Sequence, residues 1–166
     1  MNNILIRTIV RLCLLLFLST PVWAAQVGEP LIPFKGIDLN GESYDLQDSI
    51  GTKPIMLVFW TSWCQTCKSE VPKINALADK FQQRGMEFVA VNVGFNDTVE
   101  RAQNFVRKTG MTYRAYFDGS GTIAGKYGLQ GVPTIIIADR QGIIQFRNFF
   151  APNIPDSSFV QLSAEK

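Results

Sequence analysis

Two cysteines three positions apart, Cys64 and Cys67, are the residues of this chain best suited to chemistry. They stand in the stretch TSWCQTCKSE, residues 61–70, with a glutamate, Glu70, three positions further on. Such a pair can form a structural disulfide, supply half of a zinc site or act as a redox centre.

Residue counts separate these three possibilities. The chain has no histidine, which excludes Ser-His-Asp triads, Cys/His nucleophile pairs and mixed Cys/His zinc sites. A zinc site made of cysteines alone needs four, and the only other cysteine is Cys13, near the N-terminus. A disulfide between Cys64 and Cys67 closes almost no loop, so it would add little stability. A redox pair without metal or cofactor is therefore expected.

The first 25 residues have the pattern of an export signal. Arg7 and Arg11 precede an apolar run over 12–18, and small residues follow, with cleavage expected after Ala24 or Ala25. A retained membrane anchor is the alternative. Without this segment 14 basic and 14 acidic residues remain, because two of the 16 basic residues lie within it. We therefore predict a periplasmic protein that does not bind nucleic acid and meets the membrane only if the segment is retained.

The remaining chain alternates between strand and helix patterns. A hairpin is expected over 31–46, around a two-residue type I′ turn at Asn40–Gly41. Strands are predicted over 55–60, 86–93, 112–117, 132–138 and 143–149, and helices over 64–84, from a capping box at 97–100, and over 122–127. The pattern predicts an α/β domain over 26–150, a mixed sheet with helices on both faces. We expect an irregular tail over 151–166, with at most a short helix around Phe159.

The predicted helix start gives the two cysteines different roles. Cys64 lies at the first turn, where free N–H groups and the helix dipole favour a thiolate. Cys67 lies one turn deeper on nearly the same face. We therefore expect Cys64 to attack a substrate disulfide and Cys67 to resolve the mixed disulfide that forms.

Two further positions allow two interpretations each. Glu70 can point inward over Cys67 and accept its proton, or it can be an ordinary exposed glutamate. Pro133 opens a buried strand in the sequence Gly131-Val132-Pro133-Thr134. A cis bond there would leave the backbone of Val132 free to pair with an extended peptide, and a trans edge proline is the alternative.

Residues 59–68, Pro72 and residues 131–134 together resemble the thioredoxin superfamily. More closely, the chain resembles the exported TlpA/ResA-like thiol-disulfide oxidoreductases over about residues 27–149, including the N-terminal hairpin and the inserted strand and helix between 112 and 127. The resemblance implies a thioredoxin-like fold and a cis peptide bond before Pro133. The chain departs from cytosolic thioredoxins at two places. Val58 replaces a buried aspartate, and the tail over 151–166 replaces a long C-terminal helix.

The same resemblance implies roles for individual residues. Cys64 would be the nucleophile, Cys67 the resolving thiol and Glu70 an active-site acid, with a Cys64–Cys67 disulfide in the oxidised state. The residues expected to contact substrate are Trp63, Val132, Pro133 and Thr134.

The implied activity is reduction of protein disulfides. The implied partners are protein thiols and disulfides, including apocytochrome c during cytochrome c maturation, and a membrane thiol carrier as the electron source. A thiol peroxidase is an alternative, because Thr61-x-x-Cys64 matches part of a peroxiredoxin loop. A non-catalytic module that binds peptides in the thioredoxin groove is another.

Overall fold

The computed structural model describes residues 25–165. The predicted export segment, with Cys13, lies outside the described residues except for Ala25, which packs into the folded domain and is buried. Within residues 25–165, no helix is long and apolar enough to cross a membrane.

A five-stranded mixed sheet forms the centre of the domain. Its strands are β3 (Ile55–Trp60), β4 (Glu87–Asn92), β5 (Arg114–Phe117), β6 (Thr134–Ala138) and β7 (Ile144–Asn148). They lie in the order β5-β4-β3-β6-β7. Strands β3, β4 and β5 run parallel, whereas β6 is antiparallel to β3 and β7 to β6. The predicted mixed sheet is confirmed, and β3, which precedes the cysteines, is its middle strand.

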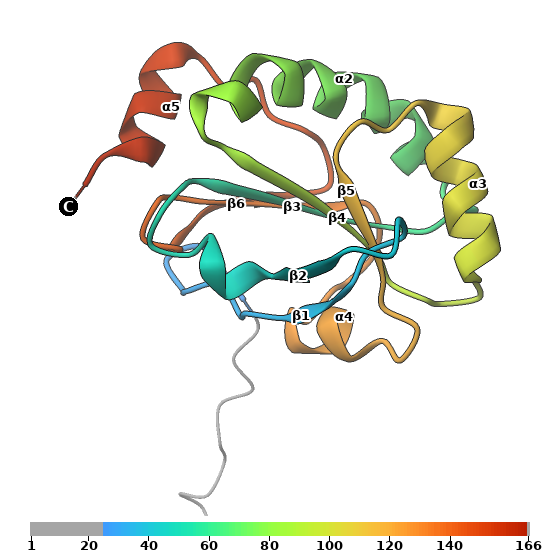
Figure 1. Cartoon of the computed structure of the whole chain (residues 1–166). Coiled ribbons are helices and arrows are strands. Elements are labelled where there is room, and N and C mark those ends of the chain that lie inside the picture. Colours follow the sequence, from blue (N-terminus) through green and yellow to red (C-terminus); the bar gives the residue numbers. More distant parts are fainter. Residues whose placement is uncertain (1–24, 166) are drawn as a thin grey trace, which may run out of the picture.

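Helices cover both faces of this sheet (Figure 1). Helices α2 (Gln65–Phe81), α3 (Val99–Thr109) and α5 (Asp156–Ser163) lie on one face. The short helix α4 (Thr122–Lys126) and the hairpin of β1 (Lys35–Ile37) and β2 (Ser43–Asp45) lie on the other. Two short 3-10 helices, η1 (Leu46–Asp48) and η2 (Gln82–Arg84), follow β2 and α2.

Strand β3 supplies the core on both faces. Met56, Val58 and Trp60 belong to the cluster that includes α2, α3 and α5, while the alternate residues join the cluster beneath the hairpin and α4. Side chains of a strand point alternately to its two faces. A strand covered on both faces is therefore apolar at every position, as the run over 55–60 is.

The predicted hairpin forms, but its predicted turn was wrong. The link between β1 and β2 is built around Asp38, whose carboxylate accepts hydrogen bonds from Asn40 N at 2.8 Å and Glu42 N at 2.9 Å. A type I′ turn needs positive φ at both central residues, whereas Gly41 has a φ of +88° and Asn40 is not in that region. A local side-chain acceptor therefore replaced the two-residue turn.

The C-terminal tail begins without regular structure over 151–155 and then forms helix α5. Helix α5 includes Phe159, whose buried ring stacks on Phe81 with ring centroids 4.7 Å apart. Ile154 is also buried against the same sheet face. The tail thus carries the short helix that the sequence allows around Phe159, and two buried apolar residues hold it against the sheet. A hollow of about 470 Å³ remains between α5 and strands β6 and β7.

Candidate active site

The two cysteines lie where the middle strand of the sheet, β3, leads into helix α2. Cys64 and Cys67 are joined by a disulfide, and both side chains are buried, with 7% and 4% of their surface exposed. Cys64 is the N-cap of α2, and its Sγ accepts a hydrogen bond from Cys67 N at 3.0 Å. The helix begins one residue later than predicted, so Cys64 stands at the end where the N–H groups lack helical partners.

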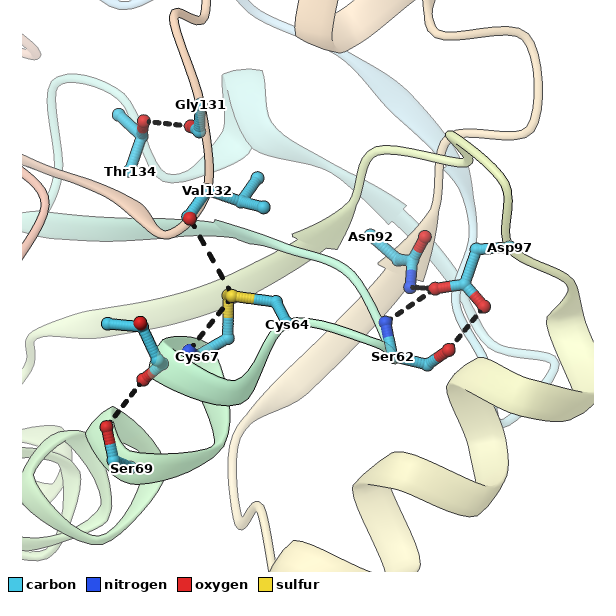
Figure 2. The surroundings of a disulfide bond; sticks show 10 residues. Ser62, Cys64, Cys67, Ser69, Asn92, Asp97, Gly131, Val132 and Thr134 are labelled. Atoms are coloured by element: carbon cyan, nitrogen blue, oxygen red, sulfur yellow. Dashed lines mark hydrogen bonds between the residues drawn. A yellow bond between two sulfur atoms is a disulfide. The ribbon is translucent and has the colours of Figure 1, made fainter.

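A loop before β6 lies against the disulfide. The Val132–Pro133 peptide bond is cis, and Val132 O lies 3.7 Å from Cys64 Sγ (Figure 2). A thiol on reduced Cys64 would donate to this carbonyl, whereas the disulfide sulfur has no proton to give. Thr134 Oγ1 donates to Gly131 O at 2.7 Å, which fixes the loop (Figure 2).

Glu70 is buried in α2, one turn beyond Cys67, with 1% of its surface exposed. One carboxylate oxygen lies 2.6 Å from Lys73 Nζ, and the other accepts a hydrogen bond from Ala151 N at 2.8 Å. The reading of Glu70 as an exposed surface charge was therefore wrong. A buried carboxylate needs such partners to offset the loss of water.

An apolar groove of about 710 Å³ lies beside the cysteines, between the residue before Cys64 and the loop before β6. Trp63 and Phe95 line it, together with Val132 and small residues of α4 among others. The Trp63 and Phe95 rings meet edge to face with centroids 6.4 Å apart, and Trp63 Nε1 donates to Phe95 O at 3.0 Å. Trp63 and Phe95 remain 54% and 65% exposed, so the two rings are open to a partner.

The predicted substrate-contacting residues differ in their accessibility. Trp63 is exposed and Val132 is half-buried, whereas Pro133 and Thr134 are buried. Thr134 also commits its hydroxyl to Gly131. Trp63 and the backbone around Val132 are thus the parts of this set that a substrate can reach directly.

Sequence reasoning missed a polar cluster centred on Asp97. The capping-box pattern predicts Asp97 as the N-cap of the second predicted helix, but the N-cap of this helix, α3, is Thr98, whose Oγ1 accepts from Arg101 N. The Asp97 carboxylate instead accepts hydrogen bonds from Ser62 and Asn92 (Figure 2). Burial tends to raise the pKa of Asp97, but the hydrogen bonds from Asn92 and Ser62 outweigh it and lower this pKa below its ordinary value.

A second missed feature follows β7. Phe149 and Phe150 are 48% and 57% exposed and directly precede Ala151, which binds Glu70. Phe149 lies beside the loop before β6, since a Cβ on Gly131 would sit 3.8 Å from its ring. In the sequence, the sign of this feature is a pair of adjacent phenylalanines at the end of the last predicted strand. Among residues 25–165, no three His, Cys, Asp or Glu side chains are grouped as a metal site.

This fold and site, a thioredoxin-like sheet with a Cys-x-x-Cys disulfide at a helix start and a cis-proline loop beside it, define a dithiol-disulfide redox protein. The AhpC/TSA family model matches residues 27–147, so the chain belongs to that family. Among its relatives, the thiol-disulfide oxidoreductase ResA of Geobacillus thermodenitrificans is 30% identical over 152 residues, covering 87% of this chain and 86% of the relative.

Other comparisons point to the same group. ResA of Bacillus thuringiensis is 32% identical over 117 residues, covering 70% of this chain and 66% of the relative, just under two thirds of its length. A crystal structure of a candidate thiol:disulfide interchange protein DsbE from Chlorobium tepidum is similar with a TM-score of 0.68 and 28% identity, covering 76% of this chain and 88% of that one. The resemblance to ResA-like thiol-disulfide oxidoreductases is confirmed.

Proposed function

We propose that this protein is an exported thiol-disulfide oxidoreductase that reduces disulfides of other proteins. The observation that carries the proposal is the position of Cys64, at the N-cap of α2 and against the Val132 carbonyl. The helix start favours the thiolate, because its free N–H groups and its dipole stabilise a negative charge at the N-cap. The adjacent apolar groove offers a surface for a polypeptide.

In the proposed reaction, the Cys64 thiolate attacks one sulfur of a substrate disulfide. A mixed disulfide forms, and the other substrate sulfur leaves as a thiolate. Cys67 then loses its proton and attacks Cys64 Sγ, which releases the second substrate thiolate. Two electrons pass to the substrate, and the protein is left with the Cys64–Cys67 disulfide seen in the structure.

Glu70 is the proposed acceptor of the Cys67 proton. It is buried one helical turn from Cys67, and no other acidic residue of α2 is buried. Its contact with Ala151 N holds one carboxylate oxygen in place. Substrate backbone is proposed to pair with Val132, beside Trp63, Pro133 and Thr134, in the manner of an added strand.

The proposed setting is the periplasm. The N-terminal charge and hydropathy pattern indicates export, and an oxidising compartment requires an electron source for a reductant. A membrane thiol carrier is the proposed source, and apocytochrome c with its Cys-x-x-Cys-His motif is the proposed substrate in cytochrome c maturation. The similarity to ResA and DsbE supports a thiol-disulfide role.

Trapping tests the assignment of the two cysteines. A Cys67→Ser variant should accumulate a mixed disulfide between Cys64 and an oxidised Cys-x-x-Cys-His peptide, as mapped by mass spectrometry. Cys64→Ser should trap nothing and reduce nothing. Trapping through a different residue, or reduction by Cys64→Ser, would contradict the proposal.

Thiol peroxidase activity is the second candidate. Thr61, three positions before Cys64, is fully buried, and its hydroxyl has no hydrogen-bond partner among the described residues. Hydrogen peroxide consumption with a thiol donor distinguishes the two activities. The oxidoreductase proposal expects peroxide turnover to be negligible beside disulfide reduction.

A further inference from the structure

The Asp97 carboxylate joins the loop that leads into Cys64 to the loop between β4 and α3. It accepts hydrogen bonds from Ser62 N at 2.6 Å, Ser62 Oγ at 2.6 Å, Asn92 Nδ2 at 2.7 Å and Thr98 N at 2.9 Å. Figure 2 shows Ser62 and Asn92 converging on it from the ends of two neighbouring strands. A carboxylate has about four acceptor positions, so Asp97 has none left for a substrate. It acts through its neighbours.

The Asp97 loop is itself fixed to the sheet. Asn92 ends β4, is fully buried, and accepts a hydrogen bond from Gly94 N at 2.9 Å. Gly94 has a φ of +69°, and a Cβ there would lie 2.4 Å from Asp118 O. The loop between β4 and α3 therefore has backbone contacts at its start and the carboxylate contacts at its end.

The residues next to this cluster are the exposed aromatic pair. Ser62 directly precedes Trp63, and Asp97 follows two residues after Phe95. The Trp63 Nε1 hydrogen bond to Phe95 O completes the connection between the two loops. Both rings stay more than half exposed and line the groove, and they form what we call the Trp63–Phe95 wall.

We propose that Asp97 is a positioning residue that keeps the Trp63–Phe95 wall ready for a bulky apolar side chain adjacent to the substrate cysteine. This inference rests on the proposed reduction of polypeptide disulfides. A wall fixed before binding spares the entropy of ordering two loops when substrate arrives. The wall affects only how a peptide with a bulky apolar side chain is recognised. The rate of thiol-disulfide exchange at Cys64 with a small disulfide should therefore not depend on Asp97.

Two other roles for Asp97 predict different results. A purely structural role would change the reaction with every disulfide through loss of folded protein. A charge effect on the Cys64 thiolate would change every rate by the same factor. Only a role in holding the wall makes the effect of replacing Asp97 depend on the side chain beside the substrate cysteine.

The test uses reduced full-length protein, freed of reductant, in single-turnover reactions. Two oxidised Cys-x-x-Cys-His peptides differ only in phenylalanine or alanine beside the attacked cysteine, and hydroxyethyl disulfide serves as a small substrate. We expect the wild type to react about 10-fold faster with the phenylalanine peptide. Asp97→Ala should reduce that ratio to less than about two-fold and leave the hydroxyethyl disulfide rate unchanged.

Matched variants separate the causes. Asp97→Asn keeps the shape but cannot accept all four hydrogen bonds, and Ser62→Ala removes only the hydroxyl bond, so both should lower the peptide ratio in part. These variants keep the test valid if Asp97→Ala does not fold. Glu100→Gln, on exposed α3 surface, neutralises a nearby acid and should keep the wild-type ratio.

The outcomes decide between the roles. A wild-type ratio retained in folded Asp97 and Ser62 variants overturns the inference, as does an equal change with all three disulfides. A wild type that reacts equally with both peptides also overturns it, while leaving peptide reduction intact. A wild type that reduces hydroxyethyl disulfide but neither peptide instead contradicts the proposed function, and this inference with it.

Discussion

Two carboxylates, Asp97 and Glu70, each hold a backbone N–H of a loop near the Cys64–Cys67 disulfide, but their surroundings differ. Asp97 is half-buried and receives four hydrogen bonds from three residues. Glu70 is almost fully buried and receives one backbone hydrogen bond, with a lysine as its ion-pair partner.

The difference in hydrogen-bond partners fits two different proposed roles, a positioning role for Asp97 and proton transfer for Glu70. All acceptor positions of Asp97 are occupied and its pKa is lowered, so it stays ionised at neutral pH and serves as a fixed acceptor. Glu70 has fewer fixed partners and lies on the helix that carries Cys67. These surroundings are consistent with the proposed roles, substrate recognition for Asp97 and acceptance of the Cys67 proton for Glu70.

Replacement of Glu70 should have the largest effect on activity. Glu70→Gln keeps the shape but removes the proton acceptor, so resolution of the mixed disulfide should slow by about 10²-fold. Attack by Cys64 should be little changed. Stopped-flow reaction with acid quench and mass spectrometry measures both steps, and Glu100→Gln is the control. Equal rates of resolution in Glu70→Gln and wild type would remove Glu70 from the mechanism.

Gly94→Ala should be the most damaging change to stability on the Asp97 side. The new Cβ would lie 2.4 Å from Asp118 O, and the backbone has positive φ, so we expect a loss of about 1–3 kcal/mol in unfolding free energy. Gly125→Ala, which meets open space in α4, is the control. Urea unfolding compares them. A Gly94→Ala variant as stable as wild type would show that the loop is not fixed as described.

The exposed phenylalanines near the Glu70 side should matter less. Phe149→Ala removes apolar surface beside Gly131, and Phe150→Ala removes the exposed ring next to it. Neither side chain makes a hydrogen bond, so each change should raise KM for a peptide disulfide by about three- to five-fold. The maximal rate should stay the same. Steady-state kinetics with a thiol regenerating system measures both, with Val160→Ala on α5 as an exposed apolar control. A fall in maximal rate alone would place these residues in the chemistry.

The smallest expected effect is a pH dependence of stability. The folded-state pKa of Asp97 lies below its unfolded value, so ionised Asp97 stabilises the fold above about pH 4, and this contribution is lost as pH falls through the lower folded value. Asp97→Asn should therefore be less stable than wild type at pH 7, with the difference shrinking near pH 3. Urea unfolding at both values checks this, and a constant difference would show that ionisation of Asp97 is irrelevant.

The sheet and the cysteine pair could be predicted from the sequence because they depend on local patterns. The apolar run over 55–60 reflects burial on both faces of β3, and the Cys64 position follows from the strand-to-helix change. Gly85, in the left-handed conformation, ends the 3-10 helix η2 that follows α2.

Features that depend on distant partners could not be predicted. Asp97 fits a capping box by sequence, but its main partner Ser62 lies 35 positions away. The Glu70 environment likewise depends on Ala151, 81 positions away. The prediction of the hairpin turn was wrong for a different reason. The Asp38 carboxylate accepts hydrogen bonds from nearby backbone N–H groups and so competes with the favoured Asn40–Gly41 turn.

The most direct test of the proposed reductase is the reduction potential of the Cys64–Cys67 couple. Equilibration of the full chain with defined ratios of reduced and oxidised dithiothreitol, followed by thiol alkylation, gives this value. A protein that donates electrons to periplasmic disulfides should have a potential well below about −180 mV. A value near about −120 mV, typical of a strong oxidant, would contradict the proposed direction of electron flow.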